Sequence, residues 1–216
     1  MINMNLDQNV SVNTHECEWI ATPQHGVLRK RLERKEAEAG HATSIVQYKA
    51  GASFNYHSHP NGEEILVLDG SFYDSLGHYK KGTYVRNPPG SEHAPYSKEG
   101  CVLFVKLNQF SPQDNARVCV DTERTQWLAG QGNLQVMPLH AFEGEHVALV
   151  KWPANEKFQP HTHFGGEEIY VISGEFIDEH GRYPAGTWLR NPHMSRHHPF
   201  TEQETIILVK VGHLSS

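Results

Sequence analysis

The sequence predicts an all-β protein made of two copies of one unit. When residues 57–106 are laid over residues 161–210, 22 of the 50 positions are identical at a constant offset of 104 residues. Short β-branched and aromatic runs recur about every ten residues, with Gly, Pro, Asn and Asp between them, which is typical of a β-sandwich or barrel. The chain also contains 18 Gly and 12 Pro, which disfavour helices.

The expected strands occupy matching places in the two halves. They are 65–68, 83–85 and 102–105 in the first half, and 169–172, 187–189 and 206–209 in the second. The segment Leu28–Ala39 is compatible with a helix or with an edge strand that has a charged outer face. The polar stretch SPQDNAR after Phe110 is typical of a linker. We therefore expect two domains, residues 1–112 and residues 113–216.

Composition excludes several classes of protein. A net charge of −6 is unfavourable for binding a phosphate backbone, so we expect no nucleic-acid partner. No apolar run approaches the roughly 18 residues of a membrane helix, and the N-terminal MINMNLDQNV has no signal-peptide core. We therefore expect a cytoplasmic protein without a membrane partner. The three scattered cysteines do not suggest a disulfide framework, which fits that compartment.

The 16 histidines include two equivalent groups. In each half, two histidines stand two residues apart, a spacing that places both rings on one face of a strand. A glutamate follows four residues after the second histidine, and a third histidine follows about thirty residues later. Three imidazoles and a carboxylate suit a borderline divalent cation such as Zn, Fe, Ni, Mn or Cu. The predicted ligands are His57, His59, Glu63 and His93 in the first half, and His161, His163, Glu167 and His197 in the second.

These residues also carry a family resemblance. The spacing from Gly51 through His57, His59 and Glu63 to Gly70 resembles the first cupin motif, and Gly82 through Pro88 and Gly90 to His93 resembles the second. The second half keeps the same pattern, except for Asn155 and Met194 where the motifs have Gly. Because Gly is favoured where φ is positive, these two changes predict a slightly reshaped second site.

The segment GGEEIYVISGEF, with the AGTW and RNP that follow it, is most similar to the cupin domain of ChrR-type anti-sigma factors. The resemblance implies two tandem jelly-roll barrels, with one divalent metal inside the mouth of each. Zn is preferred on this basis, with Fe or Ni as alternatives. The motif spacing favours Glu63 and Glu167 over the adjacent Glu64 and Glu168 as ligands.

The resemblance leaves the function open between two classes. One is a ChrR-like regulatory or sensing protein. The HxxxCxxC motif of the anti-sigma domain is absent, so we do not expect a sigma factor as partner. The other is a metal-dependent dioxygenase acting on a small carbonyl substrate. Both accommodate a small molecule in the barrel and a homo-oligomer, and one working site beside a relic is a further alternative.

Other residues have structural interpretations. In the repeated Arg-Asn-Pro segments, Arg86 and Arg190 are expected to be buried and paired with Asp74 or Asp178 in a turn. The alternative is that Arg86-Asn87 and Arg190-Asn191 orient a carboxylate ligand or bind an anionic substrate. Phe72, Tyr79 and their counterparts Phe176 and Tyr183 are expected to pack in the core or in hairpins, and Cys101 to be a buried small hydrophobe. The basic run at residues 29–35 alternates with glutamates, which favours a solvated charged face.

Overall fold

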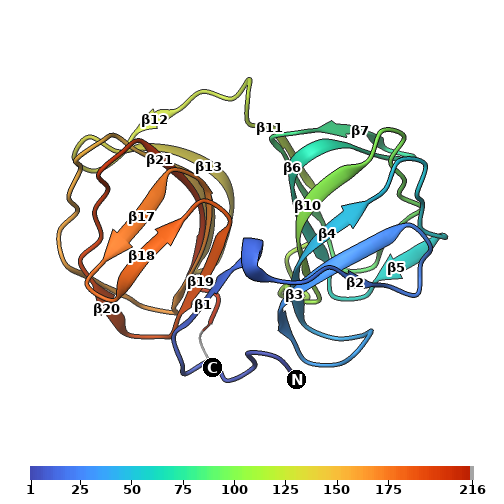
Figure 1. The fold of residues 1–216 in the computed structure, drawn as a ribbon, viewed down its shortest axis with the longest axis horizontal. Helices are drawn as coiled ribbons and strands as arrows, with labels where there is room; N and C mark the ends of the chain where they lie inside the picture. Colours follow the sequence, from blue (N-terminus) through green and yellow to red (C-terminus); the bar gives the residue numbers. More distant parts are fainter. Residues whose placement is uncertain (215–216) are drawn as a thin grey trace. The chain divides into compact units, whose positions relative to one another are not determined.

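The computed structural model describes residues 1–214, which form an almost entirely β-stranded protein (Figure 1). The one helix among these residues is the short 3₁₀ turn η1 (Thr14–Glu16). The described part of the chain has no helix long and apolar enough to cross a membrane. The predicted all-β class is confirmed. The strands gather into two compact units, one made of Met1–Met4 and Cys17–Thr125, the other of Asn5–Glu16 and Gln126–Ser216.

The first unit is a curved antiparallel sheet with a short ribbon at its mouth. Its main sheet has the order β11-β8-β6-β10-β4-β3-β2, and β7 pairs with the end of β6, while β5 and β9 form the ribbon. The strands are β2 (Ile20–Ala21), β3 (Val27–Arg34), β4 (Ala42–Tyr48), β5 (His57–His59), β6 (Glu63–Asp74), β7 (Gly77–Lys80), β8 (Thr83–Asn87), β9 (Ser91–His93), β10 (Cys101–Leu107) and β11 (Val118–Asp121).

The second unit repeats this topology. Its main sheet has the order β1-β19-β16-β21-β14-β13-β12, and the ribbons are β15–β20 and β17–β18. The strands are β1 (Val10–Asn13), β12 (Leu128–Ala129), β13 (Gln135–Phe142), β14 (Glu145–Trp152), β15 (His161–His163), β16 (Glu167–Ser173), β17 (Glu175–Asp178), β18 (Gly181–Pro184), β19 (Thr187–Asn191), β20 (Ser195–His197) and β21 (Thr205–Val211).

One edge strand of each unit comes from the other half of the sequence. Strand β11 pairs with β8 in the first unit, with Val118 opposite Arg86. Strand β1 pairs with β19 in the second unit, with Val10 opposite Arg190. The two edge strands start 108 residues apart, close to the 104-residue offset of the repeat. A compact unit is therefore not one continuous repeat, and the division at residues 112/113 stays a prediction.

Each unit has its own apolar core inside the sheet. In the first unit, Ile65, Val67, Val85 and Leu103 are almost completely buried, and Cys101 packs with them as predicted. The aromatic residues Phe72 and Tyr79 lie in this core, as Phe176 does in the second unit, which confirms their packing role. These residues alternate with outward-facing ones along their strands, as expected of a sheet closed around a core.

The basic run forms strand β3 rather than a helix, and two of its three arginines are not on a solvated face. A bulge between Arg31 and Glu33 shifts the register against β4. Arg29 and Arg34 are only 7% and 5% exposed. The expectation of a solvated charged face is therefore wrong for these two residues, because β3 turns them toward the barrel interior.

Two turns of the second unit have a non-glycine residue where the first unit has glycine, yet they keep the same backbone conformation. Gly51 and Gly90 have φ values of 77° and 80°, while Asn155 and Met194, at the equivalent places, have 60° and 62°. The backbone conformation is thus kept without glycine, so the expected reshaping does not extend to these dihedral angles. A residue with a Cβ atom in this region costs about 1–2 kcal/mol, and asparagine tolerates it best.

Replacing Met194 by Gly is expected to stabilise the second unit by about 0.5–1 kcal/mol, because relief of left-handed strain exceeds the added entropy of an unfolded glycine. The matched change Gly90→Met should destabilise the first unit by about 1 kcal/mol through the same strain. A Cβ atom at Gly90 would meet no atom within 4 Å, so steric clash does not enter. Urea unfolding of the metal-free protein measures both; shifts of the two variants in the same direction would contradict the argument.

Candidate metal centres

Antiparallel pairing of two short strands assembles the candidate site of the first unit. Strand β5 carries His57 and His59 on one face, and β9 brings His93 directly opposite His57. Glu63 begins the neighbouring strand β6. His59, Glu63 and His93 are buried, whereas His57 is partly exposed. The structure therefore brings all four predicted ligands of the first unit to one end of the barrel.

Their donor atoms converge. The Nε2 atoms of His59 and His93 lie 2.9 Å apart. An oxygen of Glu63 lies 3.5 Å from the first nitrogen and 3.4 Å from the second. The His57 ring is centred 4.7 Å from that of His59. Lone pairs that face each other this closely repel unless a proton or a cation lies among them.

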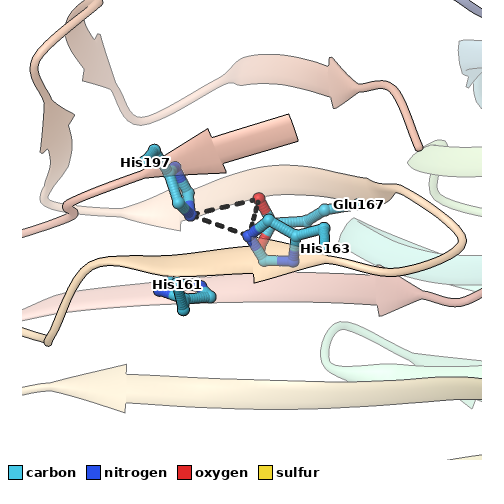
Figure 2. A group of neighbouring side chains, drawn as sticks. All are labelled: His161, His163, Glu167 and His197. Atoms are coloured by element: carbon cyan, nitrogen blue, oxygen red, sulfur yellow. Dashed lines mark hydrogen bonds and ion pairs between the residues drawn. The ribbon is translucent and has the colours of Figure 1, made fainter. Parts of the chain in front are cut away.

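The second unit repeats the arrangement, as Figure 2 shows. His161 lies opposite His197 in the pairing of β15 with β20. The Nε2 atoms of His163 and His197 are 2.9 Å apart, and an oxygen of Glu167 lies 3.4 Å from His163. The same carboxylate oxygen lies 3.6 Å from the Nε2 of His197.

The two groups of side chains differ slightly in how close the glutamate lies to the three histidines. In the second unit, all four side chains offer ligand atoms within 4.8 Å of one another. In the first unit the three histidines meet this limit, and Glu63 is close to His59 and His93 only. Both groups could hold a metal ion, and the second is the more compact in this structure.

Hydrogen bonds to the other ring nitrogen fix the orientation of the outer histidines. The Nδ1 atoms of His57 and His161 lie 2.8 Å and 3.0 Å from the backbone carbonyls of Asn55 and Gln159. A carbonyl oxygen can only accept, so each Nδ1 carries the proton. The Nε2 lone pair of each ring is thereby left free for a cation.

An aspartate orients the third histidine of each site. These aspartates were expected to pair with the buried arginines instead. The Nδ1 of His93 lies 3.1 Å from Asp74, and that of His197 lies 3.2 Å from Asp178. The predicted pairing of these aspartates with Arg86 and Arg190 is wrong. The signal was available, because both aspartates are identical positions at the same 104-residue offset as the histidines.

Asparagines complete the set by holding the glutamates. Asn87 donates a hydrogen bond of 3.1 Å to Glu63, and Asn191 donates one of 3.0 Å to Glu167. Each asparagine ends a strand, β8 or β19, that pairs with the strand carrying the glutamate. This contact is the one expected under the alternative interpretation of the repeated RNP segments, in which they orient a carboxylate.

The neighbouring glutamates face away from the sites. Glu64 accepts a hydrogen bond from Tyr84 at 3.0 Å and lies 3.6 Å from Arg86. Glu168 accepts one from Trp188 at 2.6 Å. Because successive side chains of a strand point to opposite faces, only one glutamate of each pair can reach the histidines.

The buried arginines have partners other than those predicted. Arg86 pairs with Asp114, from the segment expected to be a linker, and its guanidinium lies 3.5 Å from the centre of the Phe110 ring. Arg190 donates a hydrogen bond of 2.7 Å to the carbonyl oxygen of Asn5. Both arginines are buried as expected, and both hold segments that are distant in sequence.

Electrostatics divides the histidines into two kinds. Burial lowers the pKa of His59, and together with His197 and His161 it lowers the pKa of His163 to about 3, so both rings are neutral at pH 7. Burial also opposes charge on His93 and His197. Nevertheless, the hydrogen bonds to Asp74 and Asp178 and the nearby glutamates raise the pKa of both.

A cavity of about 600 Å³ opens onto the site of the first unit. His57, His59 and Glu63 form part of its lining. Most of the remaining wall is apolar, with Phe54 and Leu103 among the residues that line it. A cavity of this volume falls within the usual range for small-molecule sites.

The double-stranded jelly-roll architecture, repeated twice with a histidine and glutamate cluster in each barrel, defines a tandem cupin. The sequence matches the ChrR Cupin-like domain family twice, over residues 7–111 and 115–215, and the chain belongs to this family. No curated protein is similar enough in sequence to match this chain.

Solved structures with the same fold share little sequence with it. A candidate dioxygenase from Nostoc punctiforme is 15% identical with a TM-score of 0.80, covering 97% of this chain and 85% of its own. Bacterial pirin YhhW from Escherichia coli, in complex with nickel(II), is 12% identical with a TM-score of 0.70, covering 94% and 98%. Oxalate decarboxylase from Bacillus subtilis, with Mn(II) centres, is 13% identical with a TM-score of 0.68, covering 95% and 78%. These likenesses show the fold.

Replacing Asp74 by Asn is expected to weaken metal affinity of the first unit by about 10–100-fold, because the His93 ring loses the carboxylate that fixes its orientation. Asp178→Asn should do the same in the second unit. The control is Asp69→Asn, an exposed aspartate beside Lys81 at the surface. Competition titration with a chromophoric chelator measures the affinities; equal affinity in all three variants would refute the role of the buried aspartates.

Metal occupancy is expected to fall as pH falls. In the metal-free protein His93 and His197 have raised pKa values, so protons begin to compete for their nitrogens above the ordinary imidazole value of about 6.5. Lower pH favours the protonated ring and hence metal release. Elemental analysis after dialysis at pH 7.5 and pH 5 checks this, and an unchanged metal content at pH 5 would rule out histidine ligation.

Proposed function

We propose that this protein binds one divalent metal per unit and acts as a ChrR-like regulatory or sensing protein. The proposed ligands are His57, His59, Glu63 and His93, and His161, His163, Glu167 and His197. The observation that carries the proposal is the approach of two Nε2 atoms to 2.9 Å beside a carboxylate oxygen, in both units. Such a group of acceptors is stabilised by a cation.

The donor set fits a borderline metal ion. Neutral imidazole nitrogens and one carboxylate suit Zn, Fe, Ni or Mn. Zn is our preferred ion on family resemblance, with Fe or Ni as alternatives. Nickel(II) and Mn(II) occur in the similar folds of the pirin and of oxalate decarboxylase. A metal held by these residues supplies a Lewis acid with coordination positions open toward the cavity.

A cavity beside one metal centre supports the sensing role. The cavity in the first unit can admit a small molecule to the side of the site lined by His57, His59 and Glu63. The sequence has no HxxxCxxC motif, so the proposal includes no sigma factor. A cytoplasmic location is part of the proposal.

A metal-dependent dioxygenase acting on a small carbonyl compound is the second candidate. The lining of the cavity by both metal-site residues and apolar side chains favours it, as does the fold shared with the candidate dioxygenase from Nostoc punctiforme. Tyr48 lines the same cavity, and burial and Glu63 raise its pKa, so its hydroxyl stays protonated. It can therefore donate a hydrogen bond to a bound carbonyl.

Protein purified without an affinity tag is expected to contain two metal equivalents per chain, because both units present the full donor set. The double variant His57→Ala/His59→Ala should lose one equivalent, and the matched His161→Ala/His163→Ala should lose the other. Elemental analysis measures the content. One equivalent, lost completely in the first variant and kept in the second, would instead support a single working site.

Oxygen consumption separates the two candidate functions. The Fe-loaded protein is mixed with small diketones and aromatic ketones while dissolved oxygen is followed with an electrode. Metal-dependent uptake that disappears in the His57→Ala/His59→Ala variant favours the dioxygenase. Binding of these compounds without oxygen uptake, on every metal tested, favours the sensing role.

A further inference from the structure

Three arginines on strand β3 form a cationic cluster at the cavity of the first unit. Arg29 and Arg34 line the cavity and are almost fully buried, and Arg31 lies close enough to Arg34 to influence it. Together with burial, the charges of Arg29 and Arg31 lower the pKa of the Arg34 guanidinium. Burying Arg29 and Arg34 together, with a half-buried Arg31 beside them, is unfavourable unless an anion balances their charges.

One carboxylate of the chain, Glu38, partly balances these charges. It pairs with both terminal nitrogens of Arg29 and interacts electrostatically with Arg34 and Arg31, but its side chain is half exposed and it carries one charge against three. Among the described residues, Arg34 donates one side-chain hydrogen bond, from Nε to the carbonyl oxygen of Ala37 at 2.8 Å, and its terminal nitrogens find no acceptor. The buried Nε of Arg29 has no acceptor within residues 1–214. Guanidinium groups that line a cavity and keep donors without acceptors are the chemistry of an anion site.

The corresponding positions of the second unit carry no such cluster. Strand register aligns Arg29 with Val136, because these residues pair with Val46 and Val150, which are 104 residues apart. By the same register, Arg31 corresponds to Pro138 and Arg34 to Ala141. The metal-site residues are identical in the two units, whereas every arginine of the cluster is replaced by an uncharged residue. The cations are therefore not needed for the barrel or for its metal centre.

The rest of the cavity defines what kind of anion fits. Val46, Phe54, Phe72, Leu103 and Val105 contribute apolar wall between the arginines and the histidines. A volume of about 600 Å³ exceeds that of an inorganic ion. An apolar wall favours a hydrocarbon or aromatic body, and a guanidinium pairs best with a planar carboxylate.

We propose that the first unit binds a small organic acid with an apolar body, whose carboxylate is held by Arg34 and Arg29 and whose other end faces the metal-site histidines. The contact at the far end rests on the proposed metal function, while the carboxylate contact does not. Glu38 occupies Arg29 in the absence of the acid and is displaced toward solvent on binding. The second unit binds no such acid.

Calorimetric titration of the full-length, Zn-loaded protein with phenylacetate, and with phenylacetamide as the neutral isostere, tests this inference. Phenylacetate should bind at least about tenfold more tightly, because only the carboxylate forms charge-assisted bonds with the arginines. Arg34→Gln should remove this preference, and Arg34→Lys should keep part of it. The control Arg182→Gln removes an exposed arginine that pairs with Glu175 and Glu202.

The outcomes separate this inference from the proposed function. If His57→Ala/His59→Ala loses metal but still prefers phenylacetate, the carboxylate site stands independently of the metal. Equal binding of the acid and the amide, absence of binding by both at millimolar concentration, or an Arg182→Gln effect as large as that of Arg34→Gln would overturn the inference. Circular dichroism of each variant confirms that a loss of preference is not a loss of fold.

Discussion

The site in each unit depends on one buried hydrogen bond between an aspartate and a histidine. Asp74 uses one oxygen to hold the Nδ1 of His93, and the other to accept hydrogen bonds from Leu76, Gly77 and Tyr79 in the hairpin turn. The same carboxylate thus fixes the turn after β6 and the ring of a candidate ligand. Asp178 does this in the second unit, with the backbone amides of His180 and Gly181. Hairpin geometry and donor geometry are therefore coupled.

Local pattern was sufficient to predict the parts of the site that follow strand periodicity. His57 and His59 share a face because they stand two residues apart. The motif spacing indicated which glutamate belongs with them, and the 104-residue repeat indicated which later histidine does. The role of Asp74 was not predicted, because its partner depends on how a hairpin folds over a strand 19 residues away. The burial of Arg29 and Arg34 was also missed, because the alternation of charges in β3 is that of an exposed strand and the bulge is a tertiary feature.

The two units share the same set of donor residues but differ in the charge of one barrel wall. Their histidines, glutamates, aspartates and asparagines superpose in sequence at one offset, and their donor distances agree within 0.2 Å for the pairs of imidazoles and carboxylates. The barrel wall differs, since β3 presents cations where β13 presents apolar side chains. The same donor set therefore lies beside a cationic wall in one unit and beside an apolar wall in the other.

The exchange of β1 and β11 has a consequence for how such a chain can be taken apart. Expression of residues 1–112 alone would leave β8 with an unpaired edge, and expression of residues 113–216 alone would leave β19 in the same condition. An open edge of this kind recruits another strand. Two copies of a single half could satisfy each other by trading their first strands, which is the arrangement of a swapped homodimer. The present chain has the topology of such a pair joined covalently, so its two halves meet at a fixed one-to-one ratio whatever the protein concentration.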